Sequence, residues 1–150
     1  MDRRSIFAFL AAALVAAPAV DRPALAGEKR HRLAIHVDQS DIAQMNLALG
    51  NASNVFEHYK SRGEGVDIEI VTYSQGLHML REDTSPVKPR LKSFKQGMPN
   101  VSFMACENTL EAMARNEGKE PPLVENAERV KAGVVTLIEL GEKGWTIVRP

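Results

Sequence analysis

The chain has 150 residues, of which 44% are hydrophobic and 25% are charged, and its 19 basic residues equal its 19 acidic residues in number. This length and this ordinary mixture favour one globular domain with one modest core. The lack of a basic excess and an aromatic content of only 5% argue against a surface for nucleic acid.

The first 26 residues have the three parts of a secretory signal peptide. Arg3 and Arg4 give a positive start, residues 6–17 are uncharged and apolar, and residues 24–26 read Ala-Leu-Ala, a small-residue cleavage site. The apolar run is about twelve residues, whereas roughly 20 are needed to span a bilayer. We therefore expect cleavage before Gly27, export to a bacterial periplasm and no stable membrane association. An uncleaved N-terminal anchor is the alternative.

Cleavage would leave residues 27–150 as a single domain. It removes three of the 19 basic and two of the 19 acidic residues, so the mature formal charge is about −1, and a surface so near neutrality permits self-association. Cys106 is the one cysteine and cannot form an internal disulfide. An unpaired cysteine in an exported protein indicates a reactive thiol or an intermolecular bond.

The first half of the mature chain predicts two strands joined by a helix. Residues 33–37 and residues 66–73 are short apolar runs, and the second begins with alternating polar residues. Asp41 with Gln44 predicts a capped helix start, and Gly63 predicts its end. Between them, apolar residues recur at steps of three and four and form one helical stripe: Ile42, Met45, Leu49, Ala52, Phe56 and Tyr59.

The second half continues the alternation. After a helical turn at residues 77–80 and a proline-containing connector, Leu91, Phe94 and Met98 predict a second helix, and residues 101–105 predict a third strand. Asn108 with Glu111 predicts a capped third helix. A short strand at Val130, a helix over residues 133–140 and a strand over residues 145–148 complete the pattern. Such alternation is typical of βαβ units, and so of a mostly parallel sheet with helices on both faces.

Ligands of open parallel sheets bind beyond the carboxyl ends of the strands. Polar residues follow the three predicted strands at this edge: His36, Asp38 and Gln39; Tyr73, Ser74, Gln75, Gly76 and His78; and Cys106, Glu107, Asn108 and Thr109.

Cys106 is the candidate reactive residue of this edge. Its predicted place is within a turn of a helix N-terminus, where unpaired amides and the helix dipole favour the thiolate, which can attack sulfur or carry it as a persulfide. The alternative is a small buried hydrophobic residue. His36 and His78 could transfer protons near this sulfur or simply form hydrogen bonds in loops. A metal site of these three residues is conceivable, but no tight ligand spacing supports it, and we expect no metal or other cofactor.

Several segments together resemble a known family. They are residues 36–38 (His-Val-Asp), residues 46–51, residues 75–77 (Gln-Gly-Leu), residues 106–110 (Cys-Glu-Asn-Thr-Leu) and residues 132–150. Over residues 33–150 the chain resembles the DsrE/DsrF-like (YchN-like) sulfur-relay superfamily, in particular its small stand-alone members.

The resemblance implies a three-layer α/β/α fold and homo-oligomers, usually trimers or hexamers. In the relay members, a cysteine in a strand-end loop carries sulfur between partner proteins, so a sulfur donor or acceptor protein is an expected partner. Those members are cytoplasmic, whereas this chain is expected to be exported, which puts the usual relay partners in doubt.

Two functions stay open at this point. The first is a sulfur carrier or sulfurtransferase with Cys106 as the persulfide-bearing residue, Asn108 and Thr109 shaping its loop, and His36 or His78 assisting. Asp38, Gln75 and Gly76 would complete the binding edge. The second is a non-catalytic oligomeric protein of the same fold that binds a small ligand at this edge.

Overall fold

The computed structural model describes residues 30–150, so the predicted signal peptide lies outside the described residues. The centre of the fold is a parallel sheet of five strands in the order β4-β3-β2-β1-β5. The strands are β1 (Arg30–Val37), β2 (Gly65–Thr72), β3 (Val101–Cys106), β4 (Ala127–Val130) and β5 (Thr146–Val148).

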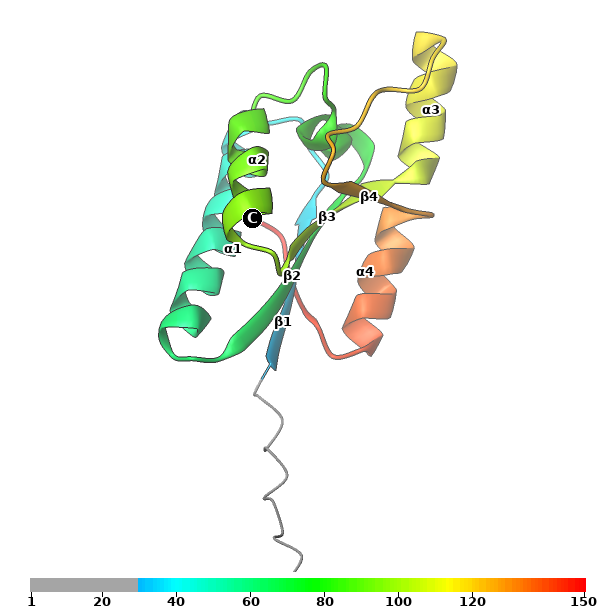
Figure 1. Cartoon of the computed structure of the whole chain (residues 1–150). Helices are drawn as coiled ribbons and strands as arrows, with labels where there is room; N and C mark the ends of the chain where they lie inside the picture. Colours follow the sequence, from blue (N-terminus) through cyan, green and yellow to red (C-terminus); the bar gives the residue numbers. More distant parts are fainter. Residues whose placement is uncertain (1–29) are drawn as a thin grey trace, which may run out of the picture.

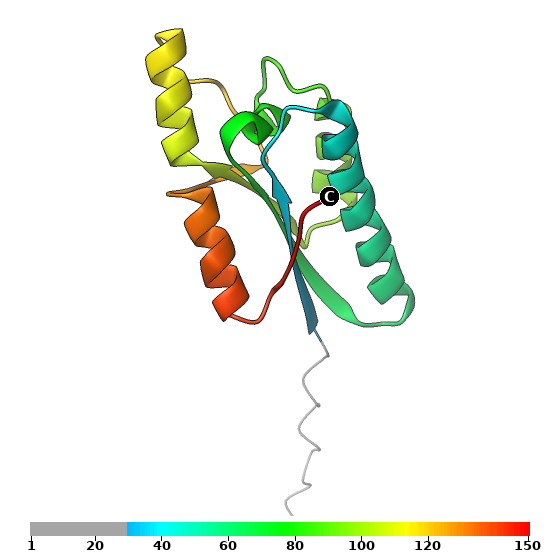
Figure 2. The same cartoon turned by 180° about the vertical axis from the view of Figure 1, so that it is seen from behind.

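Helices lie on both sides of this sheet, which confirms the predicted three-layer α/β/α fold (Figure 1). Helices α1 (Ile42–Ser61) and α2 (Lys88–Gly97) cover one face, and α4 (Gly133–Glu142) covers the other (Figures 1 and 2). The short 3-10 helix η1 (Ser74–Leu80) and α3 (Glu107–Glu117) contact each other. No helix within residues 30–150 combines the length and the apolar character that a membrane span needs.

Side-chain alternation along the strands divides the core in two. Ile35 of β1 and Phe103 of β3 belong to the larger cluster, together with residues of α1 and α2. Their neighbours Ala34 and Met104 face the opposite way and pack with Leu137 and other residues of the α4 side. Because both faces of the sheet are covered, the strands read in the sequence as nearly continuous apolar runs.

The first helix largely follows its prediction. Asp41 caps it by accepting a hydrogen bond from the amide of Ala43 at 2.9 Å. Gln44 departs from the expected capping box, because its side chain accepts from the amide of Gln39. The buried side of the helix consists of Met45, Ala48, Leu49, Ala52 and Phe56. Ile42 was expected on this side but is 52% exposed.

The start of α3 corrects one prediction. Cys106, not Asn108, is the N-cap, and the helix begins at Glu107. The reason is that β3 extends through Cys106, so strand and helix follow each other without a linker. Asn108 lies in the first turn instead, where its backbone amide donates to the carbonyl oxygen of Lys131 at 3.3 Å.

Candidate functional site

The sheet register places Tyr73 and Cys106 side by side. Thr72 of β2 and Ala105 of β3 are Cα partners, and the next residue of each strand is Tyr73 or Cys106. Because side chains alternate along extended backbone, Cys106 points to the same side as Met104, the α4 side, and Tyr73 also packs against that cluster. Cys106 is in turn the Cα partner of Val130, the last residue of β4.

A depression of about 470 Å³ opens at this point, and we call it the Cys106 depression. It lies between the β2–η1 link and the first turns of α3 and α4. Its lining residues are Tyr73, Ser74, Gln75, Cys106, Asn108, Thr109, Ala112, Met113, Asn116, Ala132, Gly133 and Val134. Four of the eight predicted site residues therefore share one cavity: Gln75, Cys106, Asn108 and Thr109.

Cys106 is almost enclosed in this wall, with 5% of its surface exposed. Its side chain makes no capping hydrogen bond to α3, although it occupies the N-cap position. Within the described part of the chain, its thiol has no hydrogen-bond partner and forms no disulfide. Cys106 therefore lies directly before the first backbone amides of α3, of which that of Asn108 donates to the carbonyl oxygen of Lys131.

His36 and Asp38 lie behind Tyr73 rather than in the depression. The Tyr73 hydroxyl is 2.5 Å from Nε2 of His36, and the two rings stack. Asp38 binds Arg149 at 3.0 and 3.1 Å and lies 3.7 Å from the His36 ring nitrogen. The two residues thus hold the aromatic wall from the β1 side and connect it to the end of the chain.

The protonation states of this group follow from burial and from Arg149. Burial lowers the pKa of His36 and outweighs the attraction of Asp38, which favours the neutral imidazole. Burial also raises the pKa of Tyr73, so its phenol stays protonated. For Asp38, burial opposes ionisation, but the hydrogen bonds and charge of Arg149 prevail and lower its pKa.

The turn after β2 is held by Thr109 and by close backbone packing. Ser74 has a left-handed backbone with a φ of 51°, and its amide donates to Oγ1 of Thr109 at 3.0 Å. Gly76 is buried against the end of β1, where a Cβ atom would collide with the carbonyl oxygen of Val37 and lie 2.7 Å from the amide of Asp38. Gly76 therefore allows the close approach of two chain segments and does not line the cavity.

His78 does not line the Cys106 depression. Its Nδ1 is 3.1 Å from Oγ1 of Thr84, whereas His36 binds Tyr73. Residues 30–150 contain no group of three or more His, Cys, Asp or Glu side chains that could hold a metal ion. His36, His78 and Cys106 are therefore not brought together as one such group.

An ion network braces α3, and sequence reasoning missed it. Arg81 is only 4% exposed and donates to both Asp83 and Glu117, the latter at 2.6 and 2.9 Å. These hydrogen bonds lower the pKa of Asp83 to about 2 and also lower that of Glu117. Because Glu117 belongs to α3, the network ties the far end of this helix to the loop after η1. Arg81 and Glu117 are 36 residues apart, and no local pattern indicates their pairing.

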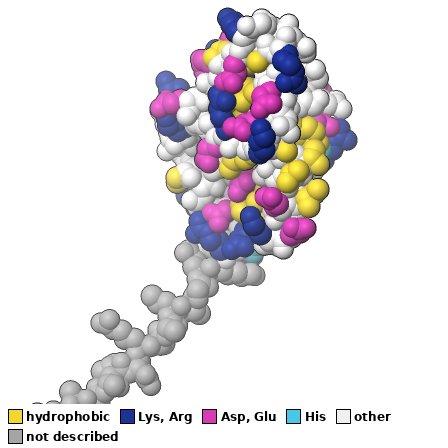
Figure 3. All heavy atoms as spheres, turned by 90° about the vertical axis from the view of Figure 1, so that its right-hand side faces the viewer, with side chains coloured by type: hydrophobic (Ala, Val, Ile, Leu, Met, Phe, Trp, Pro, Cys, Tyr) yellow, Lys and Arg dark blue, Asp and Glu magenta, His cyan; other side chains and the backbone are white. Residues whose placement is uncertain are grey.

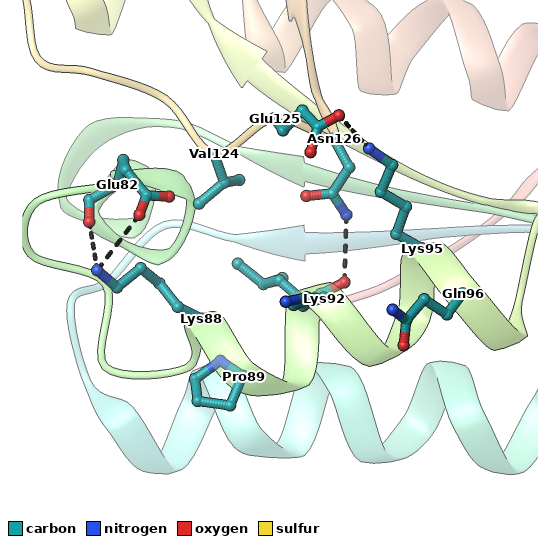
Figure 4. Close-up of a pocket in the computed structure, with 10 residues that line it drawn as sticks. Glu82, Lys88, Pro89, Lys92, Lys95, Gln96, Val124, Glu125 and Asn126 are labelled. Atoms are coloured by element: carbon teal, nitrogen blue, oxygen red, sulfur yellow. Dashed lines mark hydrogen bonds and ion pairs between the residues drawn. The ribbon is translucent and has the colours of Figure 1, made fainter.

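A larger depression of about 570 Å³ lies between α2 and the segment around Val124 (Figure 4). Its polar groups bind one another: Lys88 donates to the carbonyl oxygen of Glu82, Lys95 pairs with Glu125, and the Asn126 amide donates to the carbonyl oxygen of Leu91. Its lining contains no cysteine, serine, threonine or histidine. The Cys106 depression is therefore the better candidate for chemistry.

Among the comparisons with known proteins, the one with solved structures gives a match. No family model and no curated protein matches this chain. Among solved structures, the chain is similar to the protein of unknown function MTH1491 from Methanobacterium thermoautotrophicum, with 30% identity and a TM-score of 0.68. The match covers 80% of this chain and 99% of the archaeal one.

Proposed function

We propose a function from this chain's own site, because the chain belongs to the same family as MTH1491 and that protein is described as one of unknown function. The chain is a sulfur-handling protein that carries sulfane sulfur as a persulfide on Cys106. The observation that supports the proposal is the position of the thiol. It is the N-cap of α3, has no hydrogen-bond partner in the described structure and lines a cavity. The resemblance of residues 106–110 to the motif of the small stand-alone members of the sulfur-relay superfamily points the same way.

The proposed loading step is a thiol exchange on sulfur. The Cys106 thiolate attacks the outer sulfur of a low-molecular-weight persulfide or polysulfide. A new S–S bond forms on Cys106 while the donor's S–S bond breaks, and the rest of the donor leaves with the electron pair, as a thiolate from a persulfide or as a chain one sulfur shorter from a polysulfide. No net oxidation occurs, and the product is a persulfide on Cys106. Transfer to an acceptor thiolate is the same exchange in reverse.

The walls of the cavity suit this step in two ways. The first turn of α3 provides backbone amides and a dipole that stabilise a negative sulfur. The polar side chains of Gln75, Asn108 and Thr109 border the sulfur and can hydrogen-bond a small donor. Because Cys106 is only 5% exposed, the surrounding wall would also protect a persulfide on it from reaction with bulk solutes.

Intact-mass spectrometry after exposure to inorganic polysulfide tests the proposal. We expect the folded protein to gain multiples of about 32 Da, the mass of one sulfur atom, which reductant removes. Cys106→Ser should gain none while keeping the circular dichroism spectrum and melting temperature of the parent. A folded protein that takes up no sulfur, and whose thiol resists alkylation from pH 5 to 10, would contradict persulfide chemistry.

The second candidate is a non-catalytic binding protein, and the near-complete burial of Cys106 is the observation that favours it. In that case the thiol packs in the wall, and a small ligand occupies the depression. The polysulfide experiment separates the two functions, because a thiol that takes up no sulfur and resists alkylation agrees only with the non-catalytic binding protein.

Export, assembly and partners belong to the same proposal. Removal of residues 1–26 would place the protein in the periplasm, and N-terminal sequencing of periplasmic material should begin within a few residues of Gly27. We propose that the mature chain forms a trimer or hexamer and exchanges sulfur with a donor or acceptor protein.

A further inference from the structure

The start of α4 is joined closely to the cysteine. Cys106 is the Cα partner of Val130, and α4 begins at Gly133, three residues later. The link between them is held to α3, because the Asn108 amide donates to the carbonyl oxygen of Lys131. Residues of the first turns of both helices, Asn108 and Thr109 of α3 and Gly133 and Val134 of α4, line the same cavity as Cys106.

The amides at the start of α4 have no side-chain cap. Ala132 is the N-cap, and its methyl group cannot accept a hydrogen bond. The first backbone bond of the helix is from the amide of Thr136 to the carbonyl of Ala132, so the amides of residues 133–135 have no acceptor in the helix. No other acceptor within residues 30–150 bonds to them. Separately, residue Cys106 is 95% buried in the wall of this cavity, and its thiol has no hydrogen-bond partner within residues 30–150.

Gly133 determines how closely the start of α4 can approach Tyr73. A Cβ atom on Gly133 would lie 3.0 Å from Cδ1 and 3.1 Å from Cβ of Tyr73. The ring cannot easily move aside, because His36 stacks on it and holds its hydroxyl. Tyr73 is the neighbour of Cys106 across the sheet. A side chain at position 133 would press on this ring, and glycine lets α4 begin directly against it.

From these contacts we infer that α4 provides a second helix N-terminus for the sulfur of Cys106, and that Gly133 is the positioning residue that seats it there. The inference rests on the proposed function and narrows it. Two helix starts without side-chain caps favour negative charge on a sulfur bound between them, so the outer sulfur of the persulfide is the group that α4 would stabilise. Among the residues that line the cavity, Tyr73 is the only titratable one besides Cys106, and its hydroxyl is bonded to His36. Glu107, the next residue after Cys106, pairs with Lys131, which also pairs with Glu111.

The test is the pH profile of iodoacetamide alkylation of the folded full chain, with two variants. Gly133→Ala should push α4 away from Tyr73, and Ala132→Ser should cap the free amides with its hydroxyl oxygen. Both should move the half-maximal pH upward, by about 0.2 to 0.7 pH units for a typical helix-terminus interaction. Gly141→Ala lies in the same helix with no atom within 4 Å of its added Cβ, and it should leave the profile unchanged.

The outcomes distinguish the role of α4 from the proposed persulfide function of Cys106. An unchanged profile in both variants, in a protein that still alkylates and loads sulfur, would overturn the role of α4 and leave the persulfide proposal standing. A parent thiol that is inert at every pH would overturn both. Ala132→Ser keeps the test decisive if Gly133→Ala fails to fold, because an added cap stabilises a helix.

Discussion

The Tyr73 hydroxyl lies 2.5 Å from Nε2 of His36, and the ring centroids are 4.9 Å apart. This pairing buries the imidazole beside the aromatic wall of the Cys106 depression, and burial is the main reason that the pKa of His36 is lowered. A histidine with a lowered folded pKa binds protons more weakly in the folded than in the unfolded chain. Its contribution to stability is therefore complete above the unfolded value of about 6.5 and is lost as the pH falls below it.

We accordingly expect the free energy of unfolding to decrease between pH 7 and pH 5, and His36→Gln to weaken that decrease. Urea unfolding at constant ionic strength measures both slopes. Gln96→Ala, at an exposed site of α2 without an ionisable side chain, is the control and should keep the parent slope. Equal slopes for all three proteins would show that protonation of His36 does not oppose folding.

Gly76 gives a second prediction, on packing. Gly76→Ala should destabilise the fold by about 1–3 kcal/mol or more, the range of an overpacked site, because the added methyl group would collide with the backbone at the end of β1. Gly50→Ala is the control: it lies inside α1 with no atom within 4 Å of its added Cβ, and it should stabilise by about 0.5–1 kcal/mol. Denaturant melts of the two variants should thus move in opposite directions, and a shift of the same sign would contradict this reading.

The buried side of α1 gives a third prediction. Phe56 is 9% exposed in the larger core, and Phe56→Ala should cost about 3–5 kcal/mol of unfolding free energy. Leu47 is on the opposite side of the same helix and is 52% exposed, so Leu47→Ala should change stability by no more than about 0.5 kcal/mol. A loss below about 1 kcal/mol for Phe56→Ala would mean that α1 packs differently.

The fourth prediction concerns self-association. Val134, Val135 and Ile138 are exposed large hydrophobic residues of α4, each at least 50% accessible. Figure 3 views the side on which α3 and α4 lie and shows hydrophobic side chains gathered among charged ones. If copies of the chain associate through α4, light scattering should report more than one mature chain for the parent, and Ile138→Glu should shift the protein toward the monomer. Lys92→Glu on α2 is the charge-changing control, and a parent that is monomeric at micromolar concentration would refute association.

Much of the fold was predictable because its signals are local. The apolar run before Cys106 and the helical spacing around Phe56 depend on neighbours in sequence, and both elements occur where they were expected. The parallel sheet followed from the alternation of strands and helices. The N-cap of α3 was misplaced at Asn108, because Asn is a good capping residue in general, whereas the length of β3 decided the cap here.

The sequence alone determined the α/β class, the main strands and helices, and the candidacy of Cys106, since each rests on composition or short-range periodicity. Only the tertiary structure decided which polar residues share the cavity. It placed Cys106, Asn108 and Thr109 in the wall of one cavity and His78 outside it. It also brought Gly133 against Tyr73 and paired Arg149 with Asp38 across 111 positions of chain. Such contacts depend on strand order and on the packing of side chains distant in sequence, and neither leaves a periodic pattern along the chain.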